Sequence, residues 1–196
     1  MLSAAFADPV SSAQVTFRAI LDAMARPGSL RTLTMLLSPP RPMNRGAAAV
    51  ALTLCDQDTP VWLDAELRAS TRVGEWLRFH CGCPLVEGPE QAAFAFASRA
   101  ADVPAFEKFN IGTVDYPDRS TTIVLQVDTL SSAPGLVLTG PGIRDRKTLQ
   151  ADPLPSDMMQ RLARNRSLFP RGIDLVLATQ DAVAALPRSV RVVEES

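Results

Sequence analysis

Histidine and lysine are nearly absent from this sequence of 196 residues. His80 is the single histidine, and Lys108 and Lys147 are the two lysines, whereas arginine occurs 18 times. A Ser–His–Asp or Cys–His arrangement would have to use His80, which directly precedes a Cys-Gly-Cys-Pro turn. Pyridoxal phosphate chemistry needs a lysine for its Schiff base, and neither lysine stands in a segment where a Schiff-base lysine would be expected. The sequence therefore predicts no catalytic residues.

Long apolar runs and an excess of charge of either sign are missing as well. No apolar stretch reaches the ~18 residues of a membrane-spanning helix, and no N-terminal stretch combines a basic start, an apolar centre and a small-residue cleavage site. The formal net charge is −1, so no global field favours nucleic acid or acidic membranes. We expect a cytoplasmic protein with neither a nucleic-acid nor a membrane partner.

The three cysteines make an odd count, and Cys81 and Cys83 are separated by only one glycine. A metal site built from these two thiols, His80 and Cys55 is the alternative to free thiols. Adjacent side chains on an extended segment point in opposite directions, and the spacing matches no standard zinc or iron–sulfur pattern. We expect free thiols, no metal and no cofactor, with a thiol–metal protein as the competing hypothesis.

Residues 11–26 carry the clearest local pattern. Ser11 and Gln14 have the spacing of a capping box. Apolar side chains then recur every three or four residues, which predicts a helix with one buried stripe. Pro27 disfavours helical geometry at the preceding residue, and Gly28 allows a sharp exit. The stripe consists of Ala13, Phe17, Ile20, Leu21 and Met24.

The remaining segments predict an α/β fold with a mixed sheet flanked by helices, in a single domain spanning residues 1–196. Helices and strands are interspersed, and hairpin-like neighbours occur late in the chain, which argues against a uniformly parallel doubly wound sheet. We predict strands at residues 29–36, 61–63, 92–97, 121–127, 135–139, 173–178 and 189–193. Further helices are predicted at 47–55, at 64–79 with Asp64 as a possible N-cap, at 102–109, and from Ser156 onward with Met159, Leu162 and Ala163 facing inward.

A turn at Gly140-Pro141-Gly142 follows a predicted strand and precedes the cations Arg144, Arg146 and Lys147. Successive backbone N–H groups at such a turn can bind an anion, and the cations would strengthen the binding. The spacing is not that of a P-loop, and proline removes one donor, so a plain tight turn is the alternative.

Asp174 is an unusual charged residue, because it stands on a predicted strand that is otherwise apolar. A partly buried carboxylate needs a partner, which Arg171, Arg188 or Arg18 could supply. A purely structural ion pair is the alternative to a ligand contact. We also expect the head group of Arg18 to reach Asp22 or Asp174. The candidate anion or ligand contacts are therefore Arg18, Gly140, Gly142, Arg144, Arg171 and Asp174.

A set of segments in fixed order resembles one protein family, the PhnH family, which forms the H subunits of the bacterial carbon–phosphorus lyase core complex. The resemblance runs from about residue 6 to residue 193. Its segments are residues 17–28 (FRAILDAMARPG), 58–63 (DTPVWL), 78–80 (RFH), 84–86 (PLV), 89–92 (PEQA), 138–143 (LTGPGI), 169–175 (FPRGIDL) and 186–188 (LPR).

This resemblance implies a mixed α/β fold like that of pyridoxal-phosphate-dependent transferases, without bound cofactor, and a homodimer. It also implies assembly with the G, I and J subunits, which join methylphosphonate to the ribose of ATP before a radical step cleaves the C–P bond. In the family the H subunit has no established catalytic residue. We therefore expect a non-catalytic interaction subunit, and the alternative is a stand-alone nucleotide- or phosphate-binding transferase.

Overall fold

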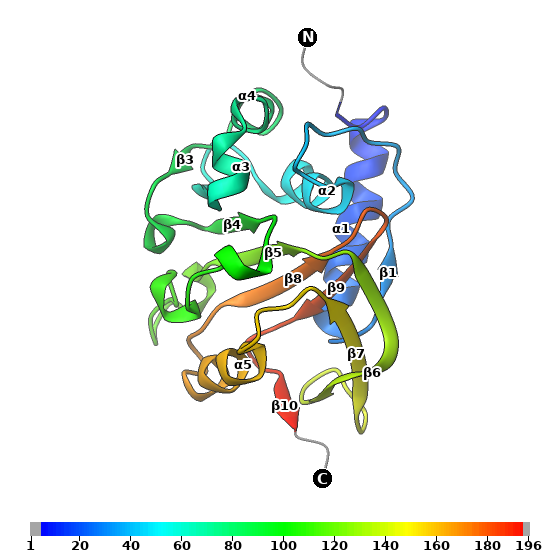
Figure 1. The fold of residues 1–196 in the computed structure, drawn as a ribbon, viewed down its shortest axis with the longest axis vertical. Helices are drawn as coiled ribbons and strands as arrows, with labels where there is room; N and C mark the ends of the chain where they lie inside the picture. The colour runs from blue at the N-terminus through cyan, green and yellow to red at the C-terminus, as the bar shows by residue number, and fades with distance from the viewer. Residues whose placement is uncertain (1–4, 194–196) are drawn as a thin grey trace.

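The computed structural model describes residues 5–193 and contains five α-helices, four short 3-10 helices and ten strands in that range (Figure 1). In chain order they are α1 (Pro9–Ala25), β1 (Arg31–Thr32), α2 (Arg45–Leu54), β2 (Val61–Leu63), α3 (Ala65–Ala69), α4 (Thr71–His80), β3 (Leu85–Val86), η1 (Pro89–Gln91), β4 (Phe94–Ala97), η2 (Ala100–Asp102), η3 (Phe106–Lys108), η4 (Pro117–Arg119), β5 (Thr122–Gln126), β6 (Thr129–Thr139), β7 (Lys147–Asp152), α5 (Met158–Ser167), β8 (Asp174–Ala178), β9 (Ala182–Leu186) and β10 (Arg191–Val193).

A seven-stranded sheet in the order β1-β9-β8-β5-β4-β2-β3 forms the centre of the molecule. The five strands from β8 to β3 run parallel. At one edge β9 pairs antiparallel with β8, and β1 pairs antiparallel with β9. A three-stranded antiparallel sheet, β10-β6-β7, packs beside it. The prediction of a mixed sheet flanked by helices is therefore confirmed.

Both faces of the large sheet are buried, because successive side chains of its central strands enter two different cores. Val124 of β5 and Val176 of β8 join the core under α1, α2 and α4. Leu125 and Leu177, their neighbours in sequence, join the core under α5, the 3-10 helices and the small sheet. This explains why β5 and β8 read as continuous apolar runs and not as alternating ones.

Helix α1 begins earlier than its sequence pattern predicted. Its N-cap is Asp8, whose carboxylate accepts a hydrogen bond from the Ser11 backbone N–H at 3.2 Å, with Pro9 in the first turn. The predicted capping box of Ser11 and Gln14 is therefore wrong. The end of the helix was predicted correctly, since its C-cap is Arg26.

The buried face of α1 is also rotated from the predicted stripe. Thr16, Ile20 and Ala23 are buried, whereas the predicted core residues Phe17 and Leu21 are 48% and 56% exposed. Two of these three buried side chains, Thr16 and Ala23, are small, and α1 packs closely on both α2 and β9. Larger side chains on this face would hold the helix away from the sheet.

Several other predicted elements differ from the structure. The helix expected at 64–79 breaks at Ser70 into α3 and α4, and the helix expected at 102–109 is replaced by the 3-10 turns η2 and η3. The strand expected at 29–36 is limited to Arg31–Thr32, while the one expected at 135–139 extends back to Thr129. In α5, Met158, Leu162 and Asn165 are buried, and the predicted Met159 and Ala163 are exposed.

Candidate functional site

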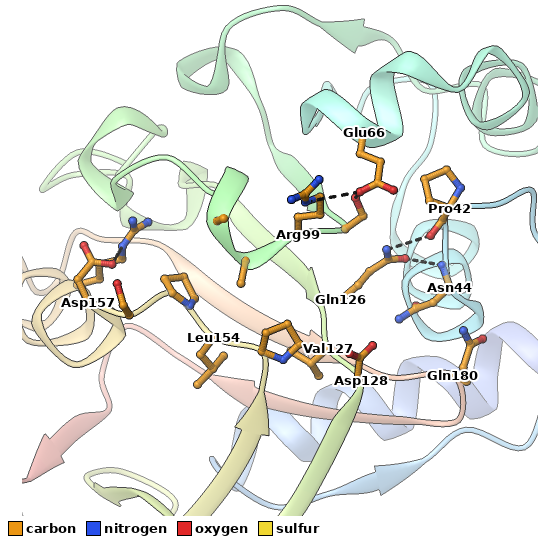
Figure 2. Close-up of a pocket in the computed structure, with 17 residues that line it drawn as sticks. Pro42, Asn44, Glu66, Arg99, Gln126, Val127, Asp128, Leu154, Asp157 and Gln180 are labelled. Carbon is orange, nitrogen blue, oxygen red and sulfur yellow. Dashed lines mark hydrogen bonds and ion pairs between the residues drawn. The ribbon is translucent and has the colours of Figure 1, made fainter.

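A cavity of about 840 Å³ lies at the carboxyl ends of the parallel strands (Figure 2). We call it the carboxyl-edge pocket. Parallel strands bring their carboxyl ends to one edge of a sheet, and that edge is the usual ligand-binding position in open α/β sheets. Its lining comes from the segments that follow β2, β4, β5 and β8, from the start of α2, and from the loop into α5; it includes Pro42, Asn44, Glu66, Ser98, Arg99, Gln126, Asp128, Ser156, Asp157, Arg161 and Gln180.

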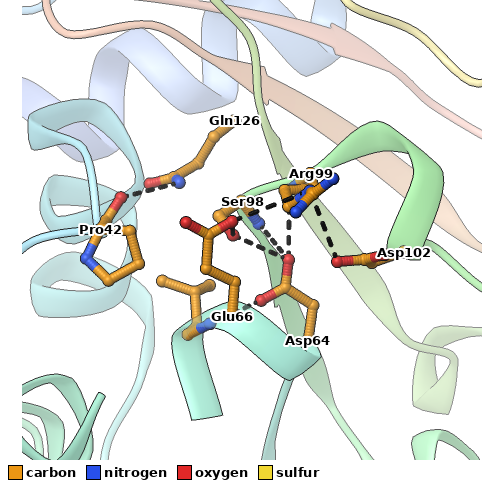
Figure 3. A network of polar contacts seen from close by, with 8 residues as sticks. Pro42, Asp64, Glu66, Ser98, Arg99, Asp102 and Gln126 are labelled. Atoms are coloured by element: carbon orange, nitrogen blue, oxygen red, sulfur yellow. Dashed lines mark hydrogen bonds and ion pairs between the residues drawn. The ribbon is translucent and has the colours of Figure 1, made fainter. Parts of the chain in front are cut away.

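The topological switch point lies between β2 and β4, beside this pocket. After β2 the chain moves outward to β3, and after β4 it moves the other way to β5. Asp64 follows β2 directly and is fully buried. Its carboxylate accepts hydrogen bonds from the Leu67 N–H at 2.8 Å, the Ser98 N–H at 2.6 Å, the Ser98 hydroxyl at 2.9 Å and the Arg99 N–H at 3.1 Å (Figure 3). Asp64 therefore caps α3 and joins the ends of β2 and β4.

Arg99 is the most loosely held cation of the pocket. Its side chain is 62% exposed, and its Nε atom lies 3.9 Å from the Glu66 carboxylate and 3.8 Å from the Asp102 carboxylate (Figure 3). Exposed ion pairs at such distances contribute little to stability, so the guanidinium is available to a ligand. Asp128, also exposed on the lining, faces the same cavity with opposite charge.

A buried amide connects the loop before α2 to the ends of β5 and β8. The side chain of Gln126 accepts a hydrogen bond from the Asn44 backbone N–H and donates one to the Pro42 carbonyl at 3.2 Å (Figure 2). The Asn44 amide donates to the Ala178 carbonyl at 2.8 Å, and its oxygen caps α2 through the Ala47 N–H. This wall of the pocket is rigid, because the hydrogen bonds of Asn44 and Pro42 to Gln126 and of Asn44 to Ala178 join segments far apart in sequence.

Arg161 on α5 is committed to structural contacts at the opposite wall. Its Nε atom donates to the Asp157 carboxylate at 2.7 Å, and Nη1 donates to the carbonyls of Val103 and Pro104, each at 2.8 Å. The hydrogen bond from Arg161 lowers the pKa of the Asp157 carboxyl. No histidine or lysine lies among the lining residues that the structure describes. The pocket can bind and orient a polar ligand, and its geometry supplies no nucleophile with an adjacent imidazole or amine base.

The structure separates the six residues predicted to contact an anion. Asp174 forms a fork with Arg188, at 2.5 Å to Nη2 and 3.2 Å to Nε, and the side chains of Arg188 and Asp174 are 14% and 13% exposed. Of its three predicted partners, Arg188 is thus the one that pairs with Asp174. Arg171 is partly buried at the turn before β8 and is not among the residues that line the carboxyl-edge pocket.

The prediction for Arg18 is wrong. Its side chain is exposed, and within residues 5–193 it pairs with neither Asp22 nor Asp174. Asp22 is paired instead with Arg26, one turn along α1, and with Arg31 of β1. The remaining predicted residues, Gly140, Gly142 and Arg144, lie in or next to a second, basic pocket at the end of α1.

The residues missed by sequence analysis share one signal. Ser98, Arg99 and Gln126 each lie at or just after the carboxyl end of a buried strand, as does Asp64, which had been noted only as a helix cap. A polar residue at that position is directed toward the ligand edge if its strand is parallel. The sequence does not state which strands are parallel.

Cys55, Cys81 and Cys83 are free thiols. Burial raises the pKa of the Cys55 thiol. The hydrogen bond between Cys81 and Cys83 raises the pKa of Cys81, together with burial, and lowers that of Cys83. Cys83 is nevertheless 1% exposed. No group of three or more metal-binding side chains is arranged to hold a metal ion in the part of the chain that the structure describes.

We expect all three thiols to be alkylated by iodoacetamide at neutral pH at least about tenfold more slowly in the folded protein than in urea. Cys55 and Cys81 are held as neutral thiols, and Cys83 is shielded from the reagent. Peptide mass spectrometry of timed samples measures each rate separately. Alkylation of Cys83 as fast in the folded chain as in the unfolded one would contradict this expectation.

Fold and pockets together define a mixed α/β protein with a polar cavity at the carboxyl edge of its sheet. Residues 4–193 match the family described as bacterial phosphonate metabolism protein (PhnH), and the chain belongs to this family. It is 44% identical over 193 residues to the alpha-D-ribose 1-methylphosphonate 5-triphosphate synthase subunit PhnH of Rhizobium meliloti (strain 1021), covering 98% of this chain and 96% of that protein. A putative C-P lyase subunit protein, HtxG, from Stutzerimonas stutzeri is 32% identical over 82 residues, 42% of each chain.

No helix within residues 5–193 is both long enough and apolar enough to cross a membrane.

Proposed function

We propose that this chain is an accessory subunit of a carbon–phosphorus lyase system that makes ribose 1-methylphosphonate 5-triphosphate. The observation that carries the proposal is the similarity to the Rhizobium meliloti subunit over 98% of this chain, which agrees with the family match over residues 4–193. The proposal includes a homodimer, association with the G, I and J subunits in the cytoplasm, and a likeness to the pyridoxal-phosphate-dependent transferase fold without its cofactor.

The side chains of the carboxyl-edge pocket support a role without catalysis by this subunit. Asp64, which lies beside the pocket, and Arg161, which lines it, are each held by several structural hydrogen bonds. Lys108 is exposed on η3, and Lys147 lies in the other pocket at the start of β7. A lysine that forms a Schiff base would be expected in the carboxyl-edge pocket, and neither lysine is among the residues that line it.

We expect the tagged chain, co-expressed with the G, I and J subunits from the same genome, to purify with all three. Subunits that bury large mutual interfaces remain associated through dilution and washing. Affinity purification, size-exclusion chromatography and mass measurement of the eluted complex test this. The same expression with the chain untagged controls for non-specific retention, and light scattering of the isolated chain tests the homodimer.

Recovery of the tagged chain alone, from cells that contain the other subunits in soluble form, would contradict the proposal. The alternative, a stand-alone nucleotide- or phosphate-binding transferase, is favoured by two observations, the volume of the carboxyl-edge pocket and its available Arg99. It requires that the isolated chain consume ATP and methylphosphonate at ordinary enzyme rates. If the isolated chain shows this turnover and Arg99→Gln abolishes it, the stand-alone transferase is supported and the accessory role is rejected.

A further inference from the structure

Two unusual sequence segments that lie over 100 residues apart meet at the end of α1. The first is Arg26-Pro27-Gly28-Ser29, which terminates the helix, and the second is the loop from Gly142 to Lys147, which joins β6 to β7. Together they line a cavity of about 280 Å³, which we call the basic pocket. We propose that this pocket binds the phosphate group of a small phosphorylated molecule. The inference does not depend on the proposed function, because it concerns the isolated chain.

The first argument is the charge of the lining. Arg26, Arg144, Arg146 and Lys147 contribute four cations and Asp145 one carboxylate, so the lining has a net formal charge of +3 in a protein whose total is −1. Positive charge that is concentrated at a concave surface attracts anions, even when the whole molecule has a small negative net charge.

The second argument is that the loop cations are not used by the fold. Arg144 and Arg146 are exposed, and between residues 5 and 193 neither they nor Lys147 form an ion pair, in contrast to Arg161 and Arg188. Arg26 is already paired with Asp22, so the binding charge comes mainly from the loop. Arginine binds phosphate oxygens through two parallel N–H groups, which makes phosphate a better match than a monovalent ion.

The third argument is that the two segments are fixed against each other by backbone contact. Gly142 has φ 82°, and a Cβ atom there would overlap the Ala25 carbonyl and come within 2.9 Å of Pro27 Cδ. Gly28 has φ 75°, and a Cβ atom there would lie 2.7 Å from Leu138 Cδ1 and 3.1 Å from Lys147 Cγ. Positive φ and this close approach both require glycine. The cations are therefore presented on a preorganised turn, which reduces the entropy cost of binding.

The position at the C-terminus of α1 works against an anion, since the helix dipole places about half a negative charge there. The three unpaired loop cations exceed this partial charge several-fold. The backbone N–H groups of Arg144, Asp145 and Arg146 also make no hydrogen bond within the described chain and can donate to an oxyanion. The cavity is slightly smaller than the usual range for small-molecule pockets, so it suits a phosphate with a short attached group and not a whole nucleotide.

The test titrates the purified full chain with inorganic phosphate, ribose 5-phosphate and ATP at low ionic strength, by calorimetry and by ³¹P line broadening. The double variant Arg144→Gln/Arg146→Gln removes two unpaired exposed cations and should keep the fold, which circular dichroism and the melting temperature verify. The matched control, Arg41→Gln/Arg72→Gln, removes two exposed arginines outside the basic pocket. We expect the loop variant to weaken binding of ribose 5-phosphate at least about tenfold and the control to change it by less than about twofold.

Stronger binding of ribose 5-phosphate than of inorganic phosphate would identify a phosphorylated sugar as the ligand, and equal binding would identify the phosphate group alone. The inference is overturned if no probe binds, if both double variants weaken binding equally, or if binding is lost in Arg99→Gln and kept in the loop variant. Co-purification with the other subunits measures a different property, so failure of either proposal leaves the other standing.

Discussion

Replacing Asp64 by alanine should lower the free energy of unfolding by about 4 kcal/mol, the largest effect that we expect from a single substitution in this protein. The carboxylate is fully buried and accepts four hydrogen bonds from Leu67, Ser98 and Arg99. Its removal leaves three backbone N–H groups and one hydroxyl without their acceptor, and each buried unsatisfied donor costs about 1–3 kcal/mol, partly relieved where water enters.

Thermal unfolding followed by circular dichroism measures this loss, which corresponds to a fall in Tm of roughly 10 °C for a chain of this size. Glu66→Ala is the matched control, because Glu66 lies two residues away but is exposed, with its nearest polar contacts at 3.4 Å and 3.9 Å. We expect the control to change stability by less than about 0.5 kcal/mol. Equal effects of both substitutions would refute the role assigned to Asp64.

Replacing Arg188 by methionine should destabilise the protein by about 3 kcal/mol. Arg188 binds the Asp174 carboxylate through Nε and Nη2 and donates from Nη1 to the Pro117 carbonyl, so it joins the start of β8 to the η4 turn. The substitution leaves Asp174 as a largely buried carboxylate without a cation. Arg188→Lys should recover little of the loss, because an ammonium group cannot reproduce the guanidinium fork.

Urea unfolding of Asp174→Leu, Arg188→Met and the double variant completes a double-mutant cycle for this pair. We expect the double variant to be more stable than Arg188→Met alone, since it removes the unpaired charge as well as its partner. A cycle with no coupling, or an Arg188→Met protein as stable as the parent, would show that the pair contributes nothing to the fold.

Local sequence patterns predicted the positions of most helices and strands, but they did not predict which strands pair with each other. Residues 122–126 and 174–178 form strands because their apolar, β-branched composition suits a sheet buried on both faces. No element was predicted for residues 182–186 or 147–152. The first of these, Ala-Val-Ala-Ala-Leu, has a composition that does not favour a strand, and it becomes β9 because β8 and β1 pair with it on either side.

In the candidate sites, too, local features could be predicted from the sequence and contacts between distant segments could not. The turn at Gly142 and the cations after it were visible as a possible anion site, yet their partner segment at Arg26–Ser29 was described only as a helix ending. Asp64 was recognised as a helix cap, while its contacts to Ser98 and Arg99 lie 34 and 35 residues along the chain. A spacing rule that works over one helical turn contains no information about such distances.

The amino-acid order by itself established where α1 ends, the family of the chain and the scarcity of residues for covalent catalysis, because each of these depends on residue type and on neighbours within a few positions. Only the tertiary structure decided which face of α1 is buried, which arginine neutralises Asp174, and which loops converge around the two pockets. These outcomes depend on the packing of segments far apart in the chain, where competing partners differ by a few kcal/mol and local propensity does not distinguish them.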